Sequence, residues 1–255
     1  MDIQVQNFAV ANLRRRPVVV ETGGFVAGFM PDTTSPYLNY ATPLPGRQPT
    51  ERDVAALVGA FRERGLLPRL EFAPGAAPAV EPALRAAGFD TEAVHEYLVC
   101  TPRTLTVPRS PDAPRVESPA TDEEYAALDA ALAEAFGGAF ASSAEGVARL
   151  RNTQESGGAV RFVRDPGGGC AGGASCSPPA EGTAELAGVG TRPAFRGRGI
   201  AGAVTAALAE AMFAQGAGSV WLEYGGEGSR RVYERAGFRP QGTRLYLSLP
   251  AGRGN

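Results

Sequence analysis

The 255-residue sequence predicts a protein of the α/β class, in which strands and helices alternate along the chain. Short apolar runs rich in β-branched residues alternate with segments whose apolar residues recur at helical spacing. The alternation occurs on both sides of a proline-rich segment. Hydrophobic residues make up 44% of the sequence, which is ordinary for a soluble globular protein and sufficient for a core.

The first hundred residues begin with an expected hairpin across Thr22-Gly23. Thr50 and Asp53 form an approximate capping box for a helix that ends at Gly65. His95 is the chain's only histidine, and a packed or hydrogen-bonded strand residue is its simpler interpretation than a catalytic one. Strands are expected over 17–21, 24–30, 37–44, 69–73 and 93–100, and helices over 50–65 and 80–87.

A segment rich in proline, serine and threonine, 101–119, has the composition of a linker. We therefore expect an N-terminal domain over 1–105, a linker over 106–114 and a second domain over 115–255. Strands of the second domain are expected over 160–164, 170–177, 184–191 and 219–224, and helices over 121–136, 144–154, 200–212 and 229–235.

A glycine-rich turn between a strand and a helix lies at 188–200. The first N–H groups of a helix have no partner within the helix and carry partial positive charge. A glycine-rich loop that opens a helix is therefore suited to bind a pyrophosphate. A Walker loop would require Gly-Lys-Ser/Thr, which is absent.

The loop reads Arg196-x-x-Gly199-x-Ala201, which resembles the Arg/Gln-x-x-Gly-x-Gly/Ala signature of the GCN5-related N-acetyltransferase (GNAT) superfamily. A second match follows at the right distance, because 233–238 resembles the Tyr-x-x-x-Gly-Phe of the same superfamily. The resemblance covers the chain from about residue 115 onward. It implies a GNAT fold, with a mixed, mostly antiparallel sheet flanked by helices, and acetyl-coenzyme A (acetyl-CoA) as the cofactor.

The resemblance also implies which residues contact the coenzyme. In the superfamily two strands splay apart, and the pantetheine arm pairs with backbone groups of the first strand, here at Val189 and Thr191. The glycine-rich loop would hold the pyrophosphate, and Ser229 and Arg230 would face the coenzyme from the next helix. The expected loop contacts are Arg196, Gly197, Arg198, Gly199, Ile200 and Ala201.

Two residues are expected to carry the chemistry. Tyr233 matches the superfamily tyrosine that protonates the leaving thiolate, and a role in packing alone is the alternative. Glu185 is the leading candidate for the general base, with Glu223 second, and an edge charge or an ion pair is the alternative for Glu185. Gly226 stands where many relatives carry an asparagine that binds pantetheine, so one side-chain hydrogen bond is missing.

An internal similarity indicates a tandem repeat. Residues 70–72 followed by a helix and 84–89 match 222–224 followed by a helix and 233–238. The first half then resembles a second, degenerate GNAT unit. Its corresponding loop, 45–49, lacks the glycine-rich pattern, so we expect it to hold no pyrophosphate. Chance similarity is the alternative.

Composition limits the remaining functions. A net charge of −2 argues against nucleic acid or a membrane surface as the main partner. Three cysteines without metal spacing, and an N-terminus unlike a signal peptide, favour a cytoplasmic protein without a metal site. The oligomeric state stays open between monomer and homodimer.

The sequence as a whole predicts an N-acyltransferase that moves an acetyl group from acetyl-CoA to a primary amine of a small molecule. One alternative is a non-catalytic acyl-CoA-binding protein that regulates or acts as a scaffold. Another is an enzyme of the same fold that uses a different acyl donor or nucleophile. The acceptor is not named by the sequence.

Overall fold

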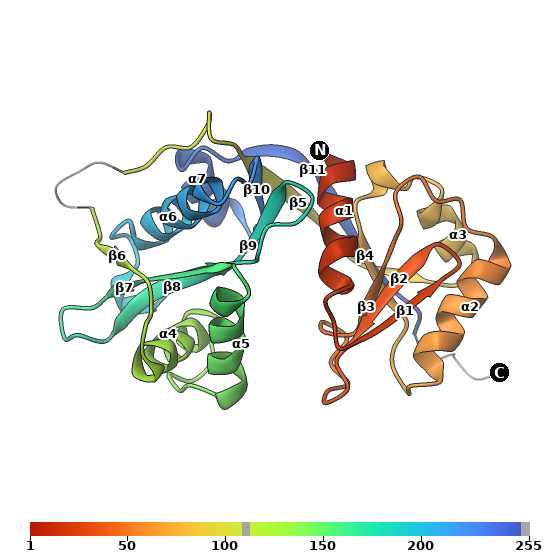
Figure 1. Ribbon diagram of the computed structural model, residues 1–255, viewed down its shortest axis with the longest axis horizontal. Helices are drawn as coiled ribbons and strands as arrows, with labels where there is room; N and C mark the ends of the chain where they lie inside the picture. Colours follow the sequence, from red (N-terminus) through yellow and green to blue (C-terminus); the bar gives the residue numbers. More distant parts are fainter. Residues whose placement is uncertain (109–112, 251–255) are drawn as a thin grey trace. The chain divides into compact units, whose positions relative to one another are not determined.

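The computed structural model describes residues 1–108 and 113–250 (Figure 1). Contacts divide them into two compact units, one formed by Met1–Tyr97 together with 241–250 and the other lying within Leu98–Pro240. Strand β5 carries the chain from the first unit into the second, and β11 carries it back. Each unit is described by itself below.

The first unit contains a sheet in the order β1-β2-β3-β4-β11-β5. Strands β1, β2 and β3 pair antiparallel, β3 and β4 pair parallel at Ala41 and Leu70, and β4 pairs antiparallel with β11. The elements of this unit are α1 (Asp2–Leu13), β1 (Val18–Thr22), β2 (Phe25–Phe29), β3 (Tyr40–Pro43), α2 (Glu51–Arg62), β4 (Arg69–Phe72), a 3₁₀ turn (Pro74–Ala76), α3 (Val80–Ala86), most of β5 (Asp90–Cys100) and most of β11 (Arg239–Ser248).

The core of the first unit forms where α2 packs on the sheet. Val54, Leu57 and Phe61 recur at helical spacing on α2 and lie buried against Phe25 and Phe72 of the strands. Burial of side chains of this size contributes about 1.5–3 kcal/mol each. The Thr50 and Asp53 capping box predicted from the sequence is present at the start of α2.

The second unit contains a sheet in the order β10-β9-β8-β7-β6, in which β9 and β10 are parallel and the other pairs antiparallel. Its elements are β6 (Val116–Glu117), α4 (Asp122–Ala135), α5 (Ala144–Glu155), β7 (Ala159–Arg164), β8 (Cys170–Cys176), β9 (Thr183–Thr191), a 3₁₀ turn (Pro193–Phe195), α6 (Ile200–Ala214), β10 (Ser219–Glu223) and α7 (Glu227–Arg235).

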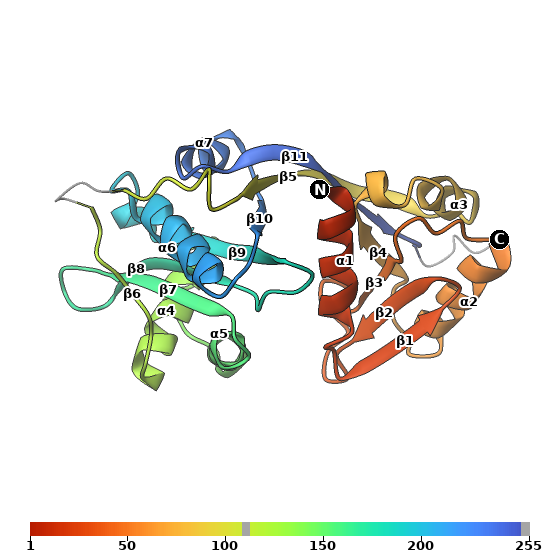
Figure 2. The same ribbon diagram turned by 45° about the horizontal axis from the view of Figure 1, so that its top comes forward.

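Helices cover both faces of this second sheet, with α6 on one face and α4 and α5 on the other (Figures 1 and 2). Val204, Leu208 and Met212 of α6 lie fully buried in the larger core. Leu128 of α4 packs in a separate core with Phe162 of β7. The predicted mixed, mostly antiparallel sheet flanked by helices is confirmed, and so is the tandem form.

The division into units differs from the expected domain ranges at the C-terminal end. Residues 241–250 fall in the predicted second domain, 115–255, but they group with the first unit because β11 pairs with β4. Neither β11 nor α1 was predicted from the sequence pattern. Part of the expected linker, 109–112, lies outside the described residues, so the ranges 1–105, 106–114 and 115–255 stay a prediction.

Helix α1 lacks the usual marks of an amphipathic surface helix. Its N-cap makes no side-chain hydrogen bond, and it is buried on several sides. One of its buried residues is polar: Gln6 is 1% exposed and donates to the Thr42 hydroxyl at 2.7 Å and to the Pro43 carbonyl at 2.6 Å. The side-chain oxygen of Gln6, Oε1, accepts a hydrogen bond from the Ala73 N–H at 3.0 Å. Gln6 therefore bridges β3 and the residue after β4, beyond the point where these two strands pair.

Candidate functional site

A pocket of about 650 Å³ lies entirely within the second unit, where the end of β9 meets the start of α6 and one face of α7. Its walls are mostly apolar, and glycine-rich backbone lines one side. The residues that line it are Thr106, Pro108, Ala135, Phe136, Val189, Gly190, Thr191, Phe195, Arg196, Gly197, Gly199, Ile200, Ala201, Gly202, Gly228, Ser229, Val232, Arg235 and Ala236.

The pocket exists because β9 and β10 separate. The two strands pair in parallel only from Thr183 to Glu185 of β9. Further along, β9 carries a bulge, since Gly188 and Val189 stand opposite the single residue Ala174 of β8. Gly188 has φ +67°, a left-handed conformation that favours glycine. The edge of β9 beyond Glu185 therefore has no β10 partner, and its backbone groups face the opening.

The turn between β9 and α6 presents a row of N–H groups. Gly199 is the N-cap of α6, with φ +79° and no side-chain hydrogen bond to the helix. The N–H groups of 197–202 donate to no acceptor within the part of the chain that the structure describes. Gly197 also has a positive φ, and a Cβ there would meet nothing within 4 Å. The turn is thus open, uncapped and able to bind an anion.

Thr191 adds a polar side chain to this apolar pocket. Its hydroxyl oxygen is buried and has no hydrogen-bond partner among the described residues. An unsatisfied buried hydroxyl costs about 1–3 kcal/mol. A ligand that offered an acceptor or donor in the pocket would recover that free energy.

Helix α7 supplies the opposite wall and carries the buried phenol of Tyr233. Tyr233 is 7% exposed, and burial raises its pKa to about 12. The side chain packs on Phe238 with ring centroids 6.3 Å apart, and its hydroxyl makes no hydrogen bond to any described residue. Tyr233 is therefore protonated at neutral pH. The lining of the pocket includes its neighbours Val232 and Ala236, but not Tyr233 itself.

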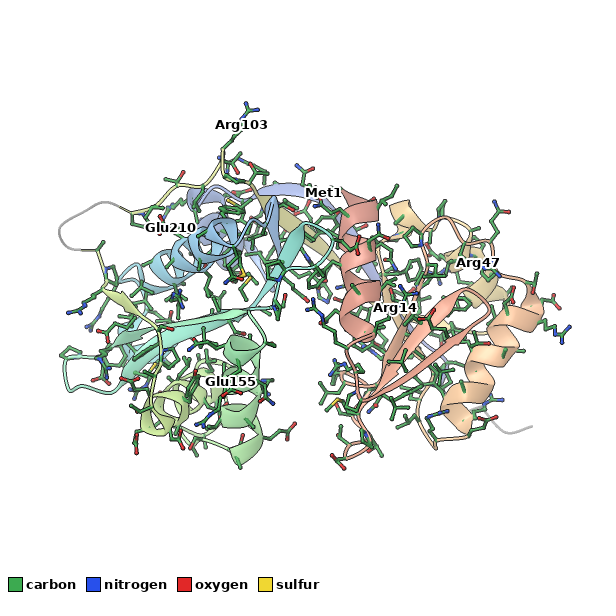
Figure 3. All side chains as sticks on the ribbon, viewed as in Figure 1. Met1, Arg14, Arg47, Arg103, Glu155 and Glu210 are labelled. Carbon is green, nitrogen blue, oxygen red and sulfur yellow. The ribbon has the colours of Figure 1, made fainter. Side chains whose placement is uncertain are left out.

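The segment before residue 109 forms a further wall that the sequence did not indicate. Thr106 and Pro108 line the pocket, and the Thr106 N–H donates to the Ala236 carbonyl at 3.1 Å. The Thr104 N–H donates to the Thr101 carbonyl in a tight turn just before. Arg103, at the tip of that turn, projects away from the ribbon (Figure 3). Proline-rich composition predicts a linker and gives no sign of this contact.

Most of the residues expected at the coenzyme come together in the pocket. Arg198 and Arg230 do not line it. Arg198 donates to the Ala194 carbonyl at 3.2 Å, and the Arg230 Nε donates to the Glu234 carboxylate at 3.0 Å. Those that do line it are Val189, Thr191, Arg196, Gly197, Gly199, Ile200, Ala201 and Ser229.

Neither candidate base lines the pocket. Glu185 is half-buried on β9 and stands opposite Trp221 of β10, at the last pair before the strands separate. Ser177 holds its backbone, since the Glu185 N–H donates to the Ser177 hydroxyl at 3.0 Å. Glu223 ends β10 and is also half-buried. The roles expected of both residues stay predictions.

The remaining candidate residues have structural surroundings. His95 packs edge-on against Tyr246, with centroids 5.1 Å apart. Cys100, Cys170 and Cys176 are free and buried, and burial raises the pKa of each thiol. The described residues contain no group of three or more His, Cys, Asp or Glu side chains arranged to hold a metal ion. Within the same residues, no helix is both long and apolar enough to cross a membrane.

Comparison with known proteins bears on the second unit first. Residues 125–238 match the model of the acetyltransferase (GNAT) family. This range contains the pocket's β9, α6 and α7 walls. No curated protein matches the chain closely enough to count as similar.

Solved structures resemble almost the whole chain. A GCN5-related N-acetyltransferase from Kribbella flavida superposes with a TM-score of 0.81 at 24% identity, over 99% of this chain and 96% of that one. A tandem GNAT protein from the clavulanic acid biosynthesis pathway gives 0.64 at 15% identity, over 99% and 88%. A GCN5-related N-acetyltransferase from Sphaerobacter thermophilus gives 0.58 at 16%, over 91% and 79%. At these identities the likeness shows the fold.

Proposed function

We propose, because residues 125–238 match the model of the acetyltransferase (GNAT) family, that this protein transfers an acetyl group from acetyl-CoA to a primary amine of a small molecule. This match supports N-acetyltransferase activity in general. The donor, the acceptor and the residues that act are inferred from the pocket of the second unit.

The observation that carries the proposal is the uncapped start of α6 beside the unpaired edge of β9. The free N–H groups of 197–202 suit a pyrophosphate, and the open edge of β9 suits an extended arm with amide groups. The buried Thr191 hydroxyl lacks a partner that such an arm would supply. Arg196 anchors the turn, since its guanidinium donates to the Thr191 and Ala135 carbonyls at 3.3 and 3.1 Å.

Acetyl-CoA supplies a thioester. The amine nitrogen attacks its acyl carbon, and the C–S bond breaks so that the sulfur leaves as a thiolate. A backbone N–H of the β9 bulge would hold the thioester carbonyl and stabilise the negative charge that develops on its oxygen. Tyr233 would donate its phenolic proton to the leaving sulfur. A phenol with a pKa of about 12 is protonated at neutral pH and so carries a proton that it can donate.

The acceptor amine must lose a proton before or as it attacks. Glu185 is the proposed base, because it is the last residue of β9 that pairs with β10 and lies next to the point where these two strands separate. It stands four residues before Val189, about 13 Å along an extended strand. We therefore place a water molecule between the carboxylate and the amine. Glu223 is the alternative base.

An aromatic wall near the pocket fits an acceptor of limited size. Phe136 lines the pocket and is 66% exposed. Phe140, 52% exposed, stacks on the Arg192 guanidinium with a centroid distance of 4.1 Å. Arg192 is held by ion pairs to Glu134 and Asp165. Exposed aromatic rings of this kind are suited to contact a ligand.

The test is release of coenzyme A from acetyl-CoA over a panel of small amines, read with a thiol reagent and confirmed by the mass of the acetylated product. We expect at least one amine to give thiol release that depends on amine concentration. Coenzyme binding without release over the whole panel, including peptide N-termini, would contradict the acetyltransferase proposal.

One observation favours a non-catalytic coenzyme-binding role as the second candidate. Gly226 is the N-cap of α7 and makes no side-chain hydrogen bond, whereas many relatives place an asparagine there. The missing hydrogen bond weakens the expected hold on pantetheine. Gly226→Asn distinguishes the two roles: an enzyme should gain coenzyme affinity and keep turnover, whereas a binding protein should gain affinity without any turnover.

A further inference from the structure

A second pocket, of about 410 Å³, lies on the outer side of α7 within the same unit. Arg231, Glu234, Arg235 and Arg239 line it. Arg235 also lines the larger pocket beside the start of α6. The two pockets therefore share an arginine, and the smaller one continues from the larger along α7.

The charges in the smaller pocket do not balance. The carboxylate of Glu234 is engaged by the Arg230 guanidinium at 3.0 Å, and Arg239 donates to the Glu234 and Phe238 carbonyls. The side chains of Arg231 and Arg235 are exposed and make no ion pair or hydrogen bond to any residue that the structure describes. Three guanidinium groups thus face one carboxylate that is already paired.

Arg231 and Arg235 stand four residues apart on α7, so their charges lie on the same face of the helix and repel each other. An anion between them would remove that repulsion. A guanidinium presents a planar fork of donors that matches a phosphate better than any other side chain does. The pair therefore favours a phosphate group with two negative charges over a carboxylate.

We propose that Arg231 and Arg235 bind the 3′-phosphate of the coenzyme, so that the site selects the 3′-phosphorylated nucleotide. The proposal rests on the proposed function, which places the pyrophosphate at 197–202. Val232 lies beside that turn, since a Cβ on Gly202 would stand 3.8 Å from the Val232 side chain. Arg235 is three residues further on, about 5 Å along the helix axis. The ribose phosphate follows the pyrophosphate at a reach of this order.

The experiment compares coenzyme A with dephospho-coenzyme A, which differs only by the absence of the 3′-phosphate. Calorimetric titration of the full chain with each ligand gives two dissociation constants and their ratio. We expect coenzyme A to bind about tenfold more tightly at low salt, with the ratio decreasing as salt increases. In the Arg231→Ala/Arg235→Ala double variant the ratio should decrease to about one.

Two control variants isolate the cause. Arg52→Ala removes an equally exposed arginine from α2 in the first unit and should keep the wild-type ratio. Arg231→Lys/Arg235→Lys keeps both charges without the forked donors and should keep part of the ratio. Both arginines of α7 are exposed, so their removal should leave the thermal midpoint nearly unchanged.

The outcomes separate this inference from the proposed function. Equal binding of the two ligands to the wild-type protein would overturn the 3′-phosphate site and leave the coenzyme pocket standing. An unchanged ratio in the double variant would overturn it too, because another group would then hold the phosphate. Absence of binding by both ligands would refute the proposed function, and the inference with it.

Discussion

Gly199→Glu tests the turn between β9 and α6 by placing a carboxylate at the N-cap of α6. Gly199 is exposed, and a Cβ there would approach only Pro114, at 3.8 Å. The new side chain fits sterically, but the residue must hold φ +79°. For an L-residue this conformation costs about 1–2 kcal/mol.

The effect on binding should be larger than the effect on folding. A carboxylate at the N-cap would accept hydrogen bonds from the same N–H groups that the pyrophosphate needs. It would also repel the pyrophosphate: two unit charges 4 Å apart interact by about 4 kcal/mol at an effective dielectric constant of about 20. If between half and all of that energy remains after screening, coenzyme affinity should decrease by about 30- to 1000-fold.

Gly216→Glu is the matched control, because Gly216 lies just after the other end of α6, is exposed, and has φ +89° with nothing within 4 Å of its Cβ. Both variants should lose a similar few degrees in thermal midpoint, and only Gly199→Glu should lose coenzyme binding by calorimetry. If Gly199→Glu is folded and binds acetyl-CoA within about threefold of wild type, the turn does not hold the pyrophosphate.

Three further outcomes are expected. Tyr233→Phe should lower kcat by about 10²–10⁴-fold with little change in coenzyme affinity. Because the pKa of Tyr233 is about 12, deprotonation of the wild-type phenol should cause no loss of activity below about pH 11. Equal turnover of variant and wild type, with chemistry rate-limiting, would show that another group donates the proton. Thr191→Val should weaken coenzyme binding about threefold to tenfold. Thr205→Val is the control, because it removes a buried hydroxyl that has no partner among the described residues and lies outside the pocket lining, and it should leave coenzyme binding unchanged. Equal effects of the two variants on coenzyme affinity would exclude a ligand contact at Thr191. Titration of the full chain should give one coenzyme site per chain. In the first unit the carboxylate of Asp53 already caps α2, and Gln6 already bridges the gap between β3 and β4. Two equivalent sites would refute this prediction.

The alternation of short strands and helices could be predicted from the sequence because the residues within each element determine its local structure. The Thr50 and Asp53 capping box is present as expected, and Thr121 and Glu124 form a second capping box at the start of α4. The strand, turn and helix around Gly199 also form as the glycine spacing predicted. Local chemistry determines these features, so a single sequence suffices to place them.

Features that depend on contacts between residues far apart in the sequence could not be predicted. Helix α1 begins without a side-chain cap, and its buried polar residue Gln6 is satisfied only by β3 and the residue after β4. β11 leaves the second unit to pair with β4, more than 160 residues earlier in the chain. The bulge at Gly188 depends on its register with β8, and the contact of Thr106 with Ala236 depends on where α7 ends.

The motifs placed most of the residues expected at the coenzyme around one pocket, and two of them lie outside its lining. The glycine-rich motif identified the turn and the start of α6, because those residues act through backbone geometry that glycine reveals. Arg198 and Arg230 were expected at the coenzyme from their positions in the motifs, yet they do not line the pocket. Which way an arginine side chain turns depends on neighbours such as Glu234, which motif spacing does not specify.

A crystal structure of the protein with acetyl-CoA tests the central claim most directly. The account predicts density for one coenzyme per chain, with the pyrophosphate on the N–H groups of 197–202 and the thioester arm along β9 beyond Glu185, close to Tyr233. Coenzyme density elsewhere, or a β9 edge that stays clear of the bound coenzyme, would contradict it.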